Sequence, residues 1–433
     1  MKPCEMTEAE LAELWRRASG RRPLELEGES WEVAYPGRRP GQGGPDFQGA
    51  LLAGKSGQLL RGDVEAHRLS SLWRAHGHHR DPAYNDVILH LVAQDDTHRP
   101  IRLENGQEVP TLALDAWIGE ADLPSPEVAA ASPRPDLGLL LDRAGGKRLE
   151  EKAACFYEEM GDGEGPQVLY RGLLGALGYA GNKDAFRNLA DRVPLRQLEG
   201  YIGNMEDEEA VAQAEAFLLG AAGLLPSQRE LPPDHPWERC LELARARCGG
   251  EVAIPVPWLR WGRPGNHPAR RLAGAARMAV GFRRQGLLEG LKSLLEKGSE
   301  ARVAGELSRG LKVEADDYWR CHLCPGTKAP GDLGALVGLG RAREMAVNIV
   351  LPFFLAWARR EGRHQLAERC LKVYKRHPKL PDNGLLGQVR ACLGPALAGA
   401  LTSACRQQGL LHLERNVCYQ GGCRACPLKE GNP

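Results

Sequence analysis

Residues 43–98 hold an unusual concentration of side chains that bind metals or transfer protons. Six of the twelve histidines lie within 32 residues, and seven carboxylates lie among them or just before them. These residues are His67, His76, His78, His79, His90 and His98, with Asp46, Asp63, Glu65, Asp81, Asp86, Asp95 and Asp96. Imidazoles and carboxylates are ligands of divalent ions and act as general acids and bases. The segment therefore predicts a metal site or an acid/base site.

Asp46 and the run from Glu65 to His67 are expected on neighbouring strands. Alternate residues of a strand share a face, so Glu65 and His67 point to one side of the sheet. Asp46 and Glu65 would then share one magnesium or manganese ion, because these ions prefer oxygen ligands. His67 would position or activate a water molecule in a catalytic site. Arg38 and Arg39, just before the motif, are candidates for contacting a substrate phosphate.

The polar residues that follow allow a second interpretation. Trp73, His76 and His78 are candidate substrate-binding residues beside the carboxylates. Alternatively, His76 and His78 form a zinc site with Asp81, because imidazole nitrogen suits zinc. That site would belong to a zinc-dependent hydrolase of small substrates. His90 lies inside an apolar run, which favours a buried histidine of the core over a metal ligand.

Three cysteines near the end of the chain have the spacing of a metal cluster. They are Cys418, Cys423 and Cys426. The gaps of four and two residues, with a Gly-Gly pair between the first two, suit zinc or an iron–sulfur cluster. The fourth ligand is open between His322, Cys405 and a residue not identified. Cys321 and Cys324 also have the two-residue gap of a metal knuckle, but the terminal three are favoured.

The composition is typical of a water-soluble globular protein of two or three domains, with 433 residues, 42% of them hydrophobic and 26% charged. No apolar run approaches the roughly 18 residues that span a bilayer, and the first ten residues do not resemble a secretory signal. We therefore expect a cytoplasmic protein with no membrane partner. The 57 basic and 56 acidic residues leave a net charge of +1, so only local basic clusters offer an electrostatic attraction for nucleic acid.

The hydrophobic pattern predicts an α+β fold in which an α/β domain precedes a large all-α region. The α/β domain, residues 1–122, is expected to contain a mixed sheet with flanking helices. A proline-rich linker follows at residues 123–137. The all-α region divides into a helical lobe at 138–250 and a second lobe at 251–433, which contains the terminal cysteines.

Local periodicity places the individual elements. In the first domain it predicts a helix at 7–18 and strands at 31–35, 50–53, 58–67 and 86–93. In the remainder it predicts helices at 148–160, 166–177, 183–192, 206–224, 237–247, 269–288 and 333–359. The last of these is expected to break or kink at Pro352.

Many short stretches of the chain resemble a bacterial family, the domain of unknown function numbered 2851. In the first domain the matching stretches are residues 36–39, 44–47, 62–67, 71–73, 76–78, 81–84 and 87–90. Later ones are 177–179 with Asn182, 263–268, 318–319, 348–352 and the three terminal cysteines. The chain departs from the family at Ala66, where the family has isoleucine. This resemblance implies no established activity.

Pro45, Asp46 and Glu65 also resemble the motif of the PD-(D/E)XK nucleases. In that superfamily an aspartate on one strand and an acid on the next build the metal site. The resemblance implies a metal-dependent nuclease-like domain whose partner is DNA or RNA. The chain has His67 where the motif has lysine, and a histidine carries no fixed charge at neutral pH.

The leading interpretation is therefore a metal-dependent nuclease, or a relic of one, acting through Asp46, Glu65 and His67. The alternative without an enzymatic activity is a non-catalytic nucleic-acid-binding protein. It would hold phosphates with the basic run at 260–271 and stack a base on Trp258 or Trp261. The zinc-dependent hydrolase remains the third interpretation, and the sequence does not indicate an oligomeric state.

Overall fold

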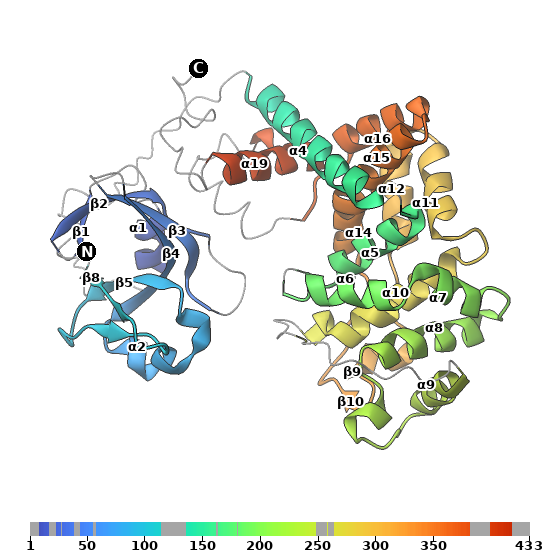
Figure 1. Cartoon of the computed structure of the whole chain (residues 1–433), viewed down its shortest axis with the longest axis horizontal. Helices are drawn as coiled ribbons and strands as arrows, with labels where there is room; N and C mark the ends of the chain where they lie inside the picture. Colours follow the sequence, from blue (N-terminus) through green and yellow to red (C-terminus); the bar gives the residue numbers. More distant parts are fainter. Residues whose placement is uncertain are drawn as a thin grey trace. The chain divides into compact units, whose positions relative to one another are not determined.

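The computed structural model describes residues 8–16, 23–26, 28–38, 44–54, 58–113, 136–161, 163–179, 181–247, 258, 264–381 and 399–417. The chain forms two compact units, drawn in Figure 1. The sheet unit comprises Met1–Gly145, Pro381–Thr402 and Arg406–Pro433. The helical unit comprises Gly146–Leu380 and Ser403–Cys405. The predicted α+β fold is confirmed.

The sheet unit is built on a six-stranded mixed sheet in the order β1-β2-β3-β4-β5-β8. The strands are β1 (Leu24–Leu26), β2 (Glu29–Tyr35), β3 (Phe47–Gly54), β4 (Leu59–Leu69), β5 (Val87–Gln94) and β8 (Thr111–Ala113). The first four pair antiparallel, whereas β4 with β5 and β5 with β8 pair parallel. The four strands predicted from the sequence are confirmed as β2 to β5. The three-residue strands β1 and β8 were missed because they are too short to show a period.

Helix α1 (Glu8–Arg16) covers one face of this sheet. Leu11 and Trp15 on the helix are fully buried and join a core with Val64 and Leu89 of the sheet. The indole of Trp15 also donates a hydrogen bond to the carbonyl of Pro36, at 2.8 Å. The predicted helix at 7–18 is confirmed within the described residues.

The connection from β4 to β5 carries the remaining histidines. It contains the short helix α2 (Leu72–Ala75) and two 3₁₀ turns, His78–Arg80 and Pro82–Tyr84. Trp73 and Tyr84 of this connection are buried in a small second core against the hairpin of β6 (Ile101–Arg102) and β7 (Glu108–Val109). This core holds the connection on the sheet.

The described part of the remaining chain is almost entirely helical. The helices are α4 (Leu137–Met160), α5 (Gly165–Leu177), α6 (Lys183–Arg192), α7 (Leu195–Ile202), α8 (Asp207–Ala221), α9 (Pro236–Arg247), α10 (Pro268–Phe282), α11 (Leu287–Glu296), α12 (Glu300–Leu311), α13 (Asp317–Cys321), α14 (Leu339–Met345), α15 (Leu351–Arg360), α16 (His364–Arg376) and α19 (Ala404–Asn416). A two-stranded hairpin of β9 (His322–Cys324) and β10 (Thr327–Lys328) follows α13. One continuous apolar core in the helical unit contains residues from both sides of position 250. The two-lobe division stays a prediction, and all but the last two residues of the predicted linker lie outside the described residues.

Two predicted helices differ from the structure at identifiable residues. The helix predicted at 269–288 is two helices, because α10 ends at Phe282 and Gly286 has a φ of 78° before α11 begins. The run predicted at 333–359 begins only at Leu339 and contains a π-helical segment, η7 (Ala346–Val350). Pro352 lies just after this segment, and its ring crowds the carbonyl four residues earlier, at Asn348. The predicted irregularity is thus a π-helical insertion that ends two residues before the proline.

Helix α8 begins a long apolar segment of the helical unit. Among the described residues, Asp207–Arg229 is long and apolar enough to pass as a membrane span, but 78% of its apolar window is buried inside the structure. Its one fully buried carboxylate, Glu215, accepts hydrogen bonds from the indoles of Trp237 and Trp319 and pairs with Arg277. The segment is accounted for as a core helix.

Candidate metal centre

Asp46 and Glu65 lie side by side across the β3–β4 pair. The backbone amide of Asp46 donates to Oε2 of Glu65 at 2.8 Å, and the amide of Ala66 donates to Oδ2 of Asp46 at 3.2 Å. Each carboxylate therefore accepts a hydrogen bond from the other's strand, which fixes both side chains. The antiparallel register that pairs Phe47 with Val64 produces this arrangement.

The second oxygen of Glu65 faces the histidines. Its Oε1 lies 3.5 Å from Nε2 of His67 and 3.4 Å from Nε2 of His78. The same nitrogen of His67 lies 3.1 Å from Nδ1 of His76. The three histidine nitrogens all lie within 4.8 Å of one another, and no other such group of three metal-ligating side chains occurs in the described part of the chain.

Three of these separations, Glu65 to His67, Glu65 to His78 and His67 to His76, are close to those around a tetrahedral ion. Donors about 2.0–2.1 Å from a zinc ion are about 3.3–3.4 Å apart from one another. Moreover, Nε2 of His78 is buried and has no hydrogen-bond partner. A buried nitrogen without a partner is costly, and a metal ion would supply the missing partner. His67, His76 and His78, with Glu65 close to two of them, therefore offer donors to a divalent transition-metal ion.

The other ring nitrogen of His67, Nδ1, contacts His90. Nδ1 of His67 lies 3.0 Å from Nε2 of His90, whose Nδ1 lies 3.5 Å from the hydroxyl of Thr111. When Nδ1 of His67 donates in this contact, its Nε2 has a lone pair for a metal. His90 is fully buried, as the sequence predicted. Its role behind His67 was missed, and it follows from the parallel register that sets Glu65 opposite His90.

Burial sets the protonation of the group. Burial, together with the charge of Asp46, raises the pKa of Glu65 to about 8. Burial and the neighbouring histidines lower the pKa of His67 to about 3 and that of His78 to about 4. At neutral pH these two imidazoles are therefore neutral, which is the form that binds metals.

The remaining predicted site residues have other surroundings. Trp73 is buried, lies 5.3 Å from the ring of His78 and donates to the carbonyl of Arg102, so it forms a wall of the site. The carboxylate of Asp81 caps the turn at Ala83 and is not among the converging donors. Arg38 is exposed and donates to the side chain of Gln48. Arg39 lies outside the described residues.

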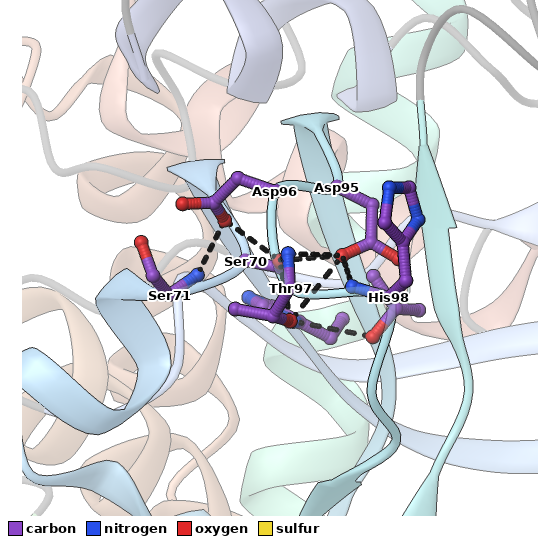
Figure 2. Close-up of polar contacts among 8 residues, drawn as sticks. Ser70, Ser71, Asp95, Asp96, Thr97 and His98 are labelled. Carbon is purple, nitrogen blue, oxygen red and sulfur yellow. Dashed lines mark hydrogen bonds and ion pairs between the residues drawn. The ribbon is translucent and has the colours of Figure 1, made fainter.

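Two further acids of the histidine-rich segment close a turn. Ser70 donates from its hydroxyl to both Asp95 and Asp96, and the amide of His98 donates to Asp95 (Figure 2). Burial would raise the pKa of Asp95, but the hydrogen bonds from Ser70 and His98 outweigh it and hold that pKa below its ordinary value. These carboxylates tie together the ends of β4 and β5.

The predicted cysteine cluster lies outside the described residues, because Cys418, Cys423 and Cys426 follow residue 417. Its candidate fourth ligands, His322 and Cys405, are both buried. Cys405, Cys321 and Cys324 are free thiols. The sulfur of Cys324 accepts a hydrogen bond from the guanidinium of Arg229 at 2.6 Å.

The basic run at 260–271 is described only from residue 264 onward. Arg270 and Arg271 are both buried. Trp258 is partly buried, packs against Phe186 with ring centroids 5.5 Å apart, and donates to the carbonyl of Ala222. Trp261 lies outside the described residues, and the stacking of a base on either tryptophan stays a prediction.

The fold and the site define an α+β protein with a histidine-rich candidate metal centre on a mixed sheet. A sequence model of the family described as "Protein of unknown function (DUF2851)" matches residues 8–382, and the chain belongs to that family. No curated protein and no solved structure matches the chain.

Proposed function

We propose that the sheet unit is the catalytic part of a metal-dependent hydrolase of the nuclease type, with nucleic acid as its substrate. One observation carries the proposal: the donor nitrogens of His67, His76 and His78 converge within 4.8 Å, and Glu65, hydrogen-bonded to Asp46, lies 3.4–3.5 Å from two of them. His76 is exposed whereas His67 is buried, so the group is open to solvent on one side. A substrate would reach the centre from that side.

The roles of the residues follow from their contacts. Glu65, His76 and His78 would hold a divalent ion, with Nε2 of His67 as a fourth donor or as the group that orients a water. The ion would lower the pKa of bound water and balance negative charge on a phosphate. Asp46 is half-buried and its carboxylate is oriented by the amide of Ala66, which suits it to accept a proton.

The topology supports the nuclease class over other hydrolases. Asp46 directly precedes β3 and Glu65 lies in β4, the neighbouring strand, as the PD-(D/E)XK motif requires. His67 stands on the same side as Glu65, where that motif has lysine. Because imidazoles outnumber carboxylates, zinc or manganese fits the set better than magnesium does. Manganese suits both the carboxylate pair and the histidines.

A zinc-dependent hydrolase of small substrates is the second candidate. His76 and His78 both belong to the group of converging histidines, which favours the zinc-dependent hydrolase. Both candidates need the same ion, so the substrate distinguishes them: cleavage of DNA or RNA supports the first, and cleavage of small esters alone supports the second. We place either activity in the cytoplasm, in keeping with the free thiols of the described cysteines.

The first experiment measures metal affinity and nucleic-acid cleavage on the same preparations. His78→Asn should weaken zinc or manganese binding by about 10- to 100-fold. Glu65→Gln should abolish cleavage of single- or double-stranded DNA or RNA. His98→Asn is the matched control, because His98 is exposed and only approaches Asp95. Unchanged metal affinity in His78→Asn would exclude the metal centre, whereas metal binding without any cleavage would exclude only the nuclease.

The C-terminal cofactor stays a separate proposal. Cys418, Cys423 and Cys426 would hold zinc or an iron–sulfur cluster, and the latter gives a broad visible absorbance. That absorbance, measured on anaerobically purified protein, should disappear in Cys423→Ala and persist in Glu65→Gln.

A further inference from the structure

The helical unit contains a group of cations around Tyr179 that the proposed hydrolase does not use. The guanidinium carbon of Arg341 lies 3.4 Å from the centre of the Tyr179 ring, and that of Arg271 lies 5.4 Å from it. Arg271 also donates to the hydroxyl of Tyr179 at 3.1 Å and to the side chain of Asn266. These residues come from the α5–α6 connection, the start of α10 and α14, which lie in the helical unit in Figure 1.

The charges in this group are not balanced. Arg271 is 6% exposed, and its hydrogen bonds go to neutral oxygens of Tyr179, Asn266 and Leu336. Burial lowers its pKa, and the charge of Arg341 acts in the same direction. The carboxylate of Glu344 pairs with Arg341 at 2.8 Å. Among the described residues, Arg341 therefore has a carboxylate partner and Arg271 has none, although burying an uncompensated charge is costly.

Two lysines of the same unit add positive charge. Lys183 follows Tyr179 by four residues at the start of α6 and is exposed. Lys152 of α4 donates to the side chain of Asn348 in η7, the π-helical continuation of α14. Burial, then the charges of Arg148 and Lys183, holds the pKa of Lys152 well below its ordinary value.

The backbone at the centre of the group is also unusual. Tyr179 has a φ of 54°, a left-handed conformation that is uncommon for a bulky residue. The Nε atoms of Arg271 and Arg341 are buried and have no hydrogen-bond partner. Strained backbone and unsatisfied donors persist where the surroundings or a ligand compensate for them. The chemistry of that ligand follows from the charges: it must be an anion with several acceptor oxygens.

We propose that Tyr179, Arg271 and Arg341 form a binding site for phosphate groups, with Lys183 four residues after Tyr179 in the chain. Guanidinium groups bind phosphate through paired hydrogen bonds, and Lys183 adds charge. Arg341 already covers a face of the Tyr179 ring, so the site takes phosphates and not stacked bases. The ligand is a nucleic-acid backbone or a small phosphorylated molecule, and the site does not depend on the proposed hydrolase.

The test measures binding of inorganic pyrophosphate and of a short single-stranded oligonucleotide by calorimetry, with EDTA present so that the sheet unit holds no metal. Arg341→Gln and Lys183→Gln should each weaken binding about tenfold, because each removes a charge-assisted contact. Lys372→Gln is the matched control, since Lys372 is exposed and pairs with Glu368 within α16. Tighter binding of the oligonucleotide identifies a nucleic-acid backbone, and tighter binding of pyrophosphate a small ligand.

Two results would overturn the proposal: no binding of either probe, or an equal loss in Lys372→Gln and in the site variants. Arg341→Lys keeps the positive charge and serves as a second variant in case Arg341→Gln does not fold. It should bind both probes more tightly than Arg341→Gln does. Glu65→Gln should bind both probes as the wild type does. A failed nuclease test and a failed phosphate test are therefore distinguishable.

Discussion

At the scale of single residues, burial shifts the pKa values of neighbouring groups in the candidate metal centre in opposite directions, and in each case it favours the uncharged form. The carboxyl group of Glu65 keeps its proton up to a pH of about 8, whereas His67 stays neutral down to about 3. Without a cation the group is therefore nearly uncharged, which suits its buried position. A bound cation would favour the ionised carboxylate of Glu65 over its protonated form. Metal binding should therefore release a proton near neutral pH.

The pH dependence of stability follows from the raised pKa of Glu65. The unfolded chain loses this proton near the ordinary value of 4.5, and the folded protein loses it near 8. Between these values the folded state binds more protons, so stability decreases as pH rises. The lowered pKa values of the histidines act in the opposite direction, and they still act between pH 6.5 and about 7.5, because an unfolded histidine is half-protonated at 6.5. The difference between the wild type and Glu65→Gln therefore isolates Glu65.

Relative to Glu65→Gln, we expect the metal-free protein to lose about 1–2 kcal/mol of unfolding free energy between pH 6.5 and 8, measured by urea denaturation in EDTA. Glu65→Gln lacks this loss because the amide does not ionise, whereas the histidines titrate in both proteins. Glu25→Gln, at an exposed position of β1, should keep it. An identical slope in the wild type and in Glu65→Gln would show that another group titrates.

At the scale of elements, the parallel pairing of β4 with β5 positions the site. It places Glu65 opposite His90, and the connection between the two strands carries His76 and His78. Gly62 permits this pairing at its start. A Cβ atom there would lie 2.3 Å from Cγ2 of Ile88 and 2.6 Å from the carbonyl oxygen of Asp86.

Gly62→Ala should therefore push β4 away from the start of β5 and cost about 1–3 kcal/mol of stability. Gly54→Ala in β3 is the control, because its nearest neighbour would be at 3.5 Å, an ordinary contact. Urea denaturation of both variants checks the difference. Equal stability of the two would mean that β4 and β5 adjust without cost.

At the scale of the whole molecule, each unit has its own core. The core of the sheet unit and the large core of the helical unit share no residue. Glu215 connects four helices of the helical unit. Its buried carboxylate on α8 binds Trp237 of α9, Arg277 of α10 and Trp319 of α13. We therefore expect the two units to unfold in separate transitions.

Glu215→Ala should lower the calorimetric transition of the helical unit, with a loss of about 3–5 kcal/mol, because it removes the buried acceptor shared by Trp237, Trp319 and the partly buried Arg277. The transition of the sheet unit, identified by its shift in Gly62→Ala, should stay in place. Glu208→Ala, at an exposed position of the same helix, should change neither transition. A single transition that moves in both Glu215→Ala and Gly62→Ala would contradict independent unfolding.

Most strands and helices, and part of the candidate site, were predictable from the amino-acid sequence. The strands at 31–35, 50–53, 58–67 and 86–93 were predictable because hydrophobic alternation is local, and the same alternation placed Glu65 and His67 on one side of a strand. Most helices were predictable from their period for the same reason. Their ends were harder, because the breaks at Gly286 and in η7 depend on one or two residues.

Which metal-binding side chains lie close together depends on the tertiary structure. His76 and His78 join Glu65 and His67 because a small core holds the β4–β5 connection on the sheet, and His90 reaches His67 through parallel pairing. The approach of Arg271 and Arg341 to Tyr179 likewise joins segments that are far apart in the chain. Such contacts depend on the register of strands and the packing of helices, which arise from the whole core and leave no local period in the sequence.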